Sequence, residues 1–266
     1  MRAIVVLYPY FRGMSKRLSM KKNVCAWMGL LLVTLFSSAF VLPHANKDKP
    51  RILVFSKTAG FRHASIGAGK LALLSLGKEN GFIVDTTEDA AVFTDKNLSK
   101  YDVVVFLSTT GHILDSAQQM AFERFIESGK GFVGVHAATD TEYDWAWYGK
   151  LVGAYFLKHP AQQQATLHVV DSTDISTRHL PTTWSRFDEW YNFKNIQPDL
   201  HVLITIDETS YQGGVNGVGH PMAWYHSYDG GRAFYTELGH TDASYTDPLY
   251  LKHLLGGILY ALGKDK

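Results

Sequence analysis

Continuous apolar runs of strand length recur through the first half of the chain, with helical patterns between them. The runs occupy residues 51–56, 82–86, 103–107 and 131–135. Such runs are typical of strands that are buried on both faces of a sheet. Residues 66–80 carry leucines near helical spacing, and Asp115 begins a second amphipathic segment that ends at Gly129. This alternation predicts an α/β fold with a doubly wound, mainly parallel sheet and helices on both faces.

The second half of the chain has a different pattern. Residues 165–171 and 201–207 are strand-like, and the segments 222–228 and 232–238 flank an Asp-Gly-Gly turn. That arrangement favours a β-hairpin. We therefore expect an antiparallel extension of the sheet in the C-terminal half, followed by a closing helix over 247–262.

The first 45 residues have the order of a secretory signal peptide. Two lysines precede the mostly apolar stretch 24–42, and a polar stretch follows it at 46–50. We therefore expect a signal peptide at 1–45 and a single domain at 46–266, exported to the periplasm or the extracellular space. The alternative is an uncleaved membrane anchor, because 19 mostly apolar residues can just span a bilayer.

Charge and composition exclude several classes of function. The chain has 26 basic and 25 acidic residues, but six of the basic residues and none of the acidic ones lie in 1–45, which leaves 20 and 25. A mildly acidic domain without a basic tract argues against a nucleic-acid partner. The single cysteine, Cys25, lies in the expected signal peptide, so the exported domain has no thiol for catalysis or disulfides. The glycine cluster at 213–219 lacks the Gly-Lys-Ser/Thr end of a phosphate-binding loop, and we interpret it as a mobile loop.

Four histidines follow strands whose carboxyl ends are expected at one rim of the sheet, where open α/β sheets bind ligands. They are His63, His112, His136 and His240. His136 lies in the sequence Gly-Val-His-Ala-Ala, which is typical of a sharp strand-to-helix turn that projects its central side chain. Its imidazole is therefore expected to be a base, an acid or a metal ligand. A solvated loop position explains His112 equally well.

Other polar residues complete the expected site. His159 precedes a proline that keeps it extended and aims it toward the cleft. Of the adjacent acids Asp188 and Glu189 we choose Glu189, because neighbouring side chains usually point apart and only one should reach the site. Asp140 either holds the imidazole of the turn histidine in one tautomer or caps a helix. Arg62 is expected to anchor an anionic or hydroxyl-rich group.

Six ordered segments between residues 51 and 263 carry a further signal. They are Gly60-Phe-Arg-His63, Gly131-Phe-Val-Gly-Val-His-Ala137, Val152-Gly-Ala-Tyr-Phe-Leu-Lys-His-Pro160, Asp188-Glu-Trp-Tyr191, Pro221-Met-Ala-Trp224 and Gly231-Arg-Ala-Phe-Tyr-Thr-Glu-Leu-Gly-His240. With these segments the chain resembles the ThuA-like family, named for trehalose utilisation, of the class I glutamine amidotransferase-like superfamily. The resemblance implies a flavodoxin-like fold, a sugar-related role, and loss of amidotransferase chemistry because His136 stands where those enzymes have cysteine. Ala154 departs from the pattern, in which a second glycine more often precedes the aromatic residue.

The leading hypothesis is an exported enzyme, a hydrolase, lyase or isomerase, that acts on a glycoside or an oxidised (keto) sugar derivative. His136, Glu189 and His63 are expected to transfer protons. The expected substrate-binding residues are Arg62, Asp140, His159, Trp190, Tyr191 and Trp224, whose aromatic members would pack against the C–H face of a sugar ring. The expected partner is thus a small-molecule carbohydrate, with membrane contact only through the N-terminal segment. Assembly into a homo-oligomer stays open.

A divalent metal such as zinc is a further expectation, because several imidazoles and a carboxylate are suitable ligands. The expected ligands are His63, His136, His159 and His240. One alternative is a non-catalytic carbohydrate-binding module that binds sugar through Trp190 or Trp224. Another is a glycoside hydrolase with two carboxylates, which would use Asp188 or Glu189 together with Asp140 or Asp144.

Overall fold

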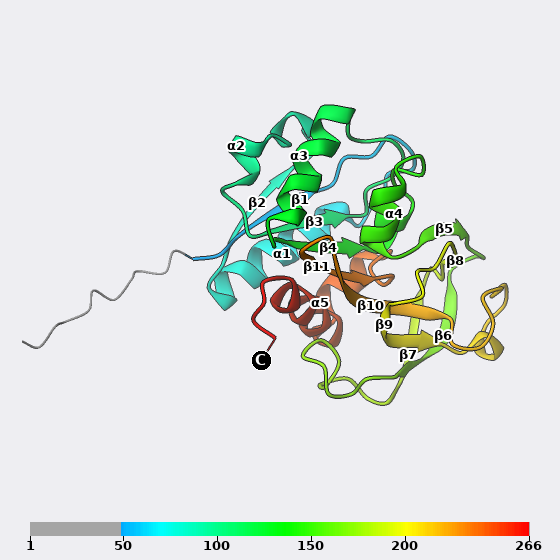
Figure 1. Cartoon of the computed structure of the whole chain (residues 1–266). Coiled ribbons are helices and arrows are strands. Elements are labelled where there is room, and N and C mark those ends of the chain that lie inside the picture. Colours follow the sequence, from blue (N-terminus) through cyan, green and yellow to red (C-terminus); the bar gives the residue numbers. More distant parts are fainter. Residues whose placement is uncertain (1–48, 266) are drawn as a thin grey trace, which may run out of the picture. The chain divides into compact units, whose positions relative to one another are not determined.

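The computed structural model describes residues 49–265 (Figure 1), so the expected signal peptide at 1–45 lies outside the described residues. A nine-stranded sheet has the strand order β2-β1-β3-β4-β11-β10-β9-β6-β7, and β5 and β8 form a separate pair. The strands are β1 (Arg51–Phe55), β2 (Ile83–Thr87), β3 (Val103–Leu107), β4 (Gly131–Val135), β5 (Tyr155–Lys158), β6 (Gln163–Val169), β7 (Thr183–Asp188), β8 (Asn192–Lys194), β9 (His201–Ile206), β10 (Pro221–Tyr228) and β11 (Gly231–Thr236).

The sheet has a parallel half and an antiparallel half. Strands β2, β1, β3, β4 and β11 run parallel, whereas β10, β9, β6 and β7 continue the sheet with antiparallel pairing. The mainly parallel sheet, its antiparallel extension and the β10–β11 hairpin are thus confirmed. Strands β3 and β4 are buried along their whole length, as their continuous apolar sequences predict.

Helices cover both faces of the parallel half (Figure 1). They are α1 (Ile66–Asn80), α2 (Asp95–Leu98), α3 (Ser116–Glu127), α4 (Ala146–Val152) and α5 (Pro248–Ala261). Helices α1 and α5 contact each other on one face, and α2 and α3 contact each other on the opposite face. In residues 49–265 no helix combines the length and the apolar character that crossing a membrane requires.

Two helices show how well local signals predicted the elements. Helix α3 begins after Asp115, as expected, with a capping box in which Asp115 and Gln118 bond each other's backbone N–H groups. Helix α1 forms where predicted, but of the three leucines that suggested its apolar face only Leu76 is buried, whereas Leu71 and Leu74 are exposed. Its buried face includes Gly77 instead, since only a residue without a Cβ atom fits against β2 there.

Strand β7 is a regular element that the sequence pattern did not reveal. Its side chains alternate strictly between exposed and buried positions. The buried positions include Arg186 and Asp188, whereas the apolar Phe187 faces outward, so the usual apolar-in, polar-out alternation is reversed in the second half of the strand. Arg186 is buried because its guanidinium stacks on the ring of Trp184 and pairs with Asp247.

The glycine-rich segment 213–219 is not the free loop that we expected from its composition. Asn192 bonds the carbonyl of Gly213 and the N–H of Val215. Asn216 bonds both backbone groups of Phe193 through its side chain. The segment is therefore fixed along β8. A loop has no neighbouring strand to bond its backbone groups, and here asparagine side chains make these hydrogen bonds instead.

Replacing Gly257 by alanine tests the packing of α5 against the sheet. A Cβ atom at this position would overlap the buried ring of Phe234 in β11. We expect the substitution to lower the free energy of unfolding by about 1–3 kcal/mol, as overpacked cores do. Urea unfolding of the full chain measures it.

Gly67→Ala in α1 is the matched control, because nothing lies within 4 Å of a Cβ atom there. We expect a result between no change and a gain of about 1 kcal/mol from higher helix propensity. Equal losses in both variants would contradict the packing explanation.

Candidate functional site

The register between β4 and β11 places the first site residues side by side. Val135 and Thr236 are paired in parallel strands, so His136 and Glu237 leave the sheet next to each other. His136 has a left-handed backbone conformation with φ of 49°, and the short 3-10 helix η2 (His136–Thr139) begins there. Such a conformation costs a non-glycine residue about 1–3 kcal/mol. The small neighbour Gly134 is required, because a Cβ atom there would crowd Tyr235.

Two further imidazoles come from loops at the same end of the sheet. His63 lies in the loop after β1, and the backbone of His240 follows β11 through Gly239. Gly239 has φ of 118°, and a Cβ atom there would meet the hydroxyls of Tyr245 and Tyr250. The glycine therefore allows the chain to turn His240 back over His136, whose ring centroid lies 5.1 Å from that of His240.

Glu189 reaches the site from the antiparallel half of the sheet. It follows β7 directly, and the segment after it is fixed by two hydrogen bonds. The N–H of Tyr191 donates to the buried carboxyl of Glu237, and the indole of Trp190 donates to the carbonyl of Gln163. These bonds hold the Glu189 side chain toward His136 and His240.

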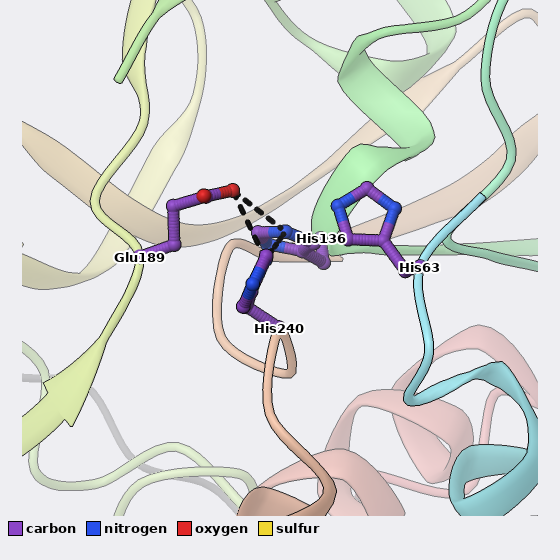
Figure 2. A group of neighbouring side chains, drawn as sticks. All are labelled: His63, His136, Glu189 and His240. Atoms are coloured by element: carbon purple, nitrogen blue, oxygen red, sulfur yellow. Dashed lines mark hydrogen bonds and ion pairs between the residues drawn. The ribbon is translucent and has the colours of Figure 1, made fainter. Parts of the chain in front are cut away.

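The three imidazoles and the carboxylate converge from four separate segments (Figure 2). One ligand-type atom from each of His63, His136, Glu189 and His240 lies within 4.8 Å of all the others. Glu189 Oε2 lies 3.0 Å from His240 Nδ1 and 3.5 Å from His136 Nε2, and these two nitrogens are 3.1 Å apart. A tetrahedral zinc ion with bonds of about 2.0–2.2 Å separates its ligands by about 3.3–3.6 Å. The triangle is thus close to the size that one shared cation needs.

The electrostatics of the group favour a neutral His63 beside an ionised Glu189. Burial, helped by the nearby His136 and His240, lowers the pKa of His63 to about 3. Nδ1 of His63 is also buried without a hydrogen-bond partner among the described residues. Burial alone would raise the pKa of Glu189, but hydrogen bonds with His136 and His240 outweigh it and hold the pKa below its usual range. Neutral imidazole and carboxylate are the forms that bind metals.

Hydrogen bonds outside the cluster orient two of the imidazoles. Nδ1 of His136 lies 2.7 Å from the carbonyl oxygen of Glu237, so Nδ1 carries a proton, and in the neutral form of the ring the lone pair of Nε2 would face the cluster. Nε2 of His240 lies 2.7 Å from the side-chain amide of Gln162. Turning that amide by 180° presents its oxygen, which can accept from a protonated Nε2 while Nδ1 faces the cluster. Such partners fix the orientation of metal-binding histidines.

Two residues that we expected at the site have other partners. Both guanidinium NH₂ groups of Arg62 bond the carboxylate of Glu88, so Arg62 does not present a free anchor. Asp140 accepts from the hydroxyl of Tyr143 instead of orienting His136. The expected role of Asp140 in fixing the tautomer is wrong, because the carbonyl of Glu237 already occupies Nδ1 of His136.

Two of the three aromatic residues that we expected to pack against a sugar ring cannot do so. Trp190 and Trp224 are completely buried, and their indole N–H groups donate to the carbonyls of Gln163 and Val152. Neither ring can contact a ligand. Tyr191 is buried as well, but its ring packs directly on His136 at a centroid distance of 4.5 Å.

Of the remaining residues considered for the site, His159 contacts Glu189, whereas His112 and Asp188 have other partners. His159 is half-exposed with Nδ1 3.2 Å from Glu189 Oε1, and it lies outside the four-residue group. His112 instead pairs with the buried Glu142, away from the group. Asp188 is fully buried and accepts from Ser244 and backbone N–H groups, so it and Glu189 do point apart.

Sequence reasoning missed Gln162, Glu237 and His220. Gln162 and Glu237 contact the imidazoles, and buried His220 links Glu208 to the carbonyl of Tyr191. Glu237 had a usable signal, because it stands three residues before His240 at the end of a buried strand. Gln162 had none, since it belongs to a run of polar residues with no periodicity.

The fold and this histidine-rich rim define an amidotransferase-like α/β protein without the cysteine nucleophile. The ThuA family model, described as trehalose utilisation, matches residues 51–261. The chain therefore belongs to the ThuA family, which is related to sugar utilisation. A comparison with functionally curated proteins gave no match.

Solved structures support the same fold. A protein from Bacteroides uniformis described as ThuA-like is 24% identical, with a TM-score of 0.69 over 82% of this chain and 94% of that chain. Another described as ThuA-like, from Parabacteroides merdae, is 19% identical, with a TM-score of 0.66 over 82% and 92% of the two chains. A β-galactosidase from Bacillus circulans sp. alkalophilus is 15% identical, with a TM-score of 0.54 over 80% of this chain and 31% of that chain. At these identities the likeness concerns the fold alone.

Substitutions of Glu237 test how this buried residue holds the segment that carries Glu189. Burial, with nearby Asp188 adding to it, raises the pKa of Glu237 well above its usual range, so we expect a protonated carboxyl at neutral pH. Glu237→Gln should then change the free energy of unfolding by less than about 1 kcal/mol. Glu237→Ala should cost about 2–4 kcal/mol, because the N–H of Tyr191 loses its buried acceptor and a cavity forms.

Urea unfolding of the two variants at pH 7 measures the difference. A loss for Glu237→Gln as large as that for Glu237→Ala would contradict a neutral Glu237.

Proposed function

We propose that this protein is a carbohydrate-active enzyme whose site binds one divalent transition metal, with zinc as the best match. The observation that carries the proposal is the convergence of ligand-type atoms from His63, His136, Glu189 and His240 within 4.8 Å of one another. Three imidazoles and one carboxylate are a usual donor set for zinc. The rim at the carboxyl ends of parallel strands is where α/β folds bind their substrates.

The substrate class follows from the family and from the chemistry of the site. The family is related to sugar utilisation, which supports a glycoside or an oxidised (keto) sugar derivative as the substrate. A bound metal polarises a carbonyl or hydroxyl oxygen and makes a neighbouring proton easier to remove. The absence of cysteine from residues 46–266 excludes the thiol chemistry of amidotransferases.

The metal changes the roles that the sequence suggested for the histidines. His136 has one ring nitrogen on the Glu237 carbonyl and the other facing the cluster, so it serves as a ligand and not as a base. His159 lies outside the ligand set but contacts Glu189, and it is half-exposed. In this proposal His159 is the imidazole that exchanges a proton with a substrate hydroxyl.

Zinc titration of the metal-free protein tests the site without knowledge of the substrate. We expect wild type to bind one zinc ion per chain by isothermal titration calorimetry. His240→Ala and Glu189→Gln each remove a ligand, and we expect them to weaken binding by about 100-fold or more. Cobalt in place of zinc should give the visible absorption of a tetrahedral ion.

His201→Ala is the matched control, because His201 pairs with Asp171 and lies outside the four-residue group. We expect this variant to bind zinc as wild type does. A wild type that binds no stoichiometric zinc, or an equal loss in His201→Ala, would contradict the metal site.

Turnover assays test the reaction. We expect the zinc-loaded protein to convert at least one member of a library of glycosides and keto-glycosides, with products detected by mass spectrometry. A chelator or the His240→Ala substitution should reduce the rate by at least about 100-fold, and added zinc should restore only the chelated wild type.

Two results would replace this proposal by an alternative. Saturable sugar binding without any product favours a carbohydrate-binding module, although burial of Trp190 and Trp224 removes the residues first expected to support it. Turnover that is insensitive to chelation favours a two-carboxylate hydrolase, although Asp188 is buried and engaged with Ser244.

A further inference from the structure

Phe61 is the most exposed aromatic side chain in residues 49–265, and it lies beside the four-residue group. The residue is 66% exposed. Its ring contacts the buried imidazole of His63 edge to face, with centroids 4.9 Å apart and an interplanar angle of 84°. An apolar ring is thus presented to solvent next to a polar, buried cluster.

The backbone around Phe61 is firmly held, so the exposure is built into the loop. Thr110, in the loop after β3, accepts from the N–H of Ala59 through its carbonyl. Its hydroxyl accepts from the N–H of Gly60 and donates to the carbonyl of Phe61, at 3.2 and 2.8 Å. With neighbouring backbone groups bound on both sides, the ring cannot reach the core by a small movement of the chain.

We propose that Phe61 is the platform on which a sugar ring packs by its C–H face, with the amide of Gln162 bonding a hydroxyl of the same sugar. This inference rests on the proposed carbohydrate substrate and names the residues that recognise it. Phe61 takes the role that the buried Trp190 and Trp224 cannot have. Gln162 is exposed and contacts His240, whereas Phe61 contacts His63. Each residue thus adjoins the four-residue group through a different imidazole.

The chemistry of the two residues fits a sugar better than a charged or wholly apolar ligand. An aromatic face packs against C–H groups, and an amide both donates to and accepts from hydroxyls. The neighbouring cation, Arg62, has both guanidinium NH₂ groups bonded to Glu88, which Lys70 also contacts, so these groups are not free to bond an anionic ligand at Phe61.

Equilibrium binding of trehalose to the zinc-loaded full chain tests the platform separately from turnover. We expect Phe61→Ala to weaken trehalose binding by about tenfold, because a stacked ring is lost. Phe61→Trp should stay within about threefold of wild type, because it keeps an aromatic face. Gln162→Ala should weaken binding by about fivefold, as loss of one hydrogen bond does.

Phe187→Ala is the matched control, because Phe187 is an exposed phenylalanine on β7, on the opposite side of the strand from Asp188. It should bind trehalose as wild type does, and zinc affinity should be unchanged in this control and in both Phe61 variants. Equal trehalose binding by wild type and Phe61→Ala, or no saturable trehalose binding by wild type, would overturn the platform. If the wild-type protein does not bind zinc, the proposed metal site is overturned instead.

Discussion

The hydrogen bond between His136 Nδ1 and the carbonyl of Glu237 is the interaction on which the site depends. It exists because β4 and β11 pair in parallel with Val135 opposite Thr236, so that the next residue of each strand emerges at the same level. The bond fixes the tautomer of His136 and aims its free nitrogen at His240 and Glu189. The left-handed backbone of His136 is tolerated because this bond, and a second one from Tyr235 to the His136 carbonyl, hold the turn.

The antiparallel half of the sheet supplies the carboxylate and holds it in place. Glu189 comes from the end of β7, the last strand in the sheet order, yet it reaches the rim of the parallel half. The backbone of Tyr191 is held at both of its polar groups, because its N–H donates to Glu237 and its carbonyl contacts buried His220. His220 in turn bonds Glu208, which also holds the N–H groups of Asn216 and Gly217. The glycine-rich segment thus serves as a fixed support behind Glu189.

Local sequence signals predicted the parallel half of the fold because each of its elements has a strong pattern of its own. The apolar strand at Val103–Leu107 and the capping box at Asp115 need no distant partner to be recognised. The rule that strand ends share a rim also selected His63, His136 and His240. It could not separate them from His112, because the pairing of His112 with Glu142 depends on a loop conformation that no local pattern encodes.

The errors arose where function and packing compete for the same residue type. Tryptophans in the matched segments suggested a sugar platform, but large aromatic rings are also the best core residues, and Trp190 and Trp224 are buried. Arg62 was expected to bind substrate, yet Glu88, 26 positions away, bonds both of its guanidinium NH₂ groups. Only tertiary structure distinguishes these cases, since burial and pairing over long sequence separations leave no periodic signal.

Anomalous diffraction at the zinc absorption edge, from crystals of the protein grown with one equivalent of zinc, is the sharpest test of whether these four side chains share a metal ion. The proposed metal site predicts one strong peak at about 2.0–2.2 Å from His136 Nε2, His240 Nδ1 and Glu189 Oε2, with His63 as the fourth ligand. Zinc found only at surface histidines such as His201, with these four side chains left in mutual contact, would contradict it.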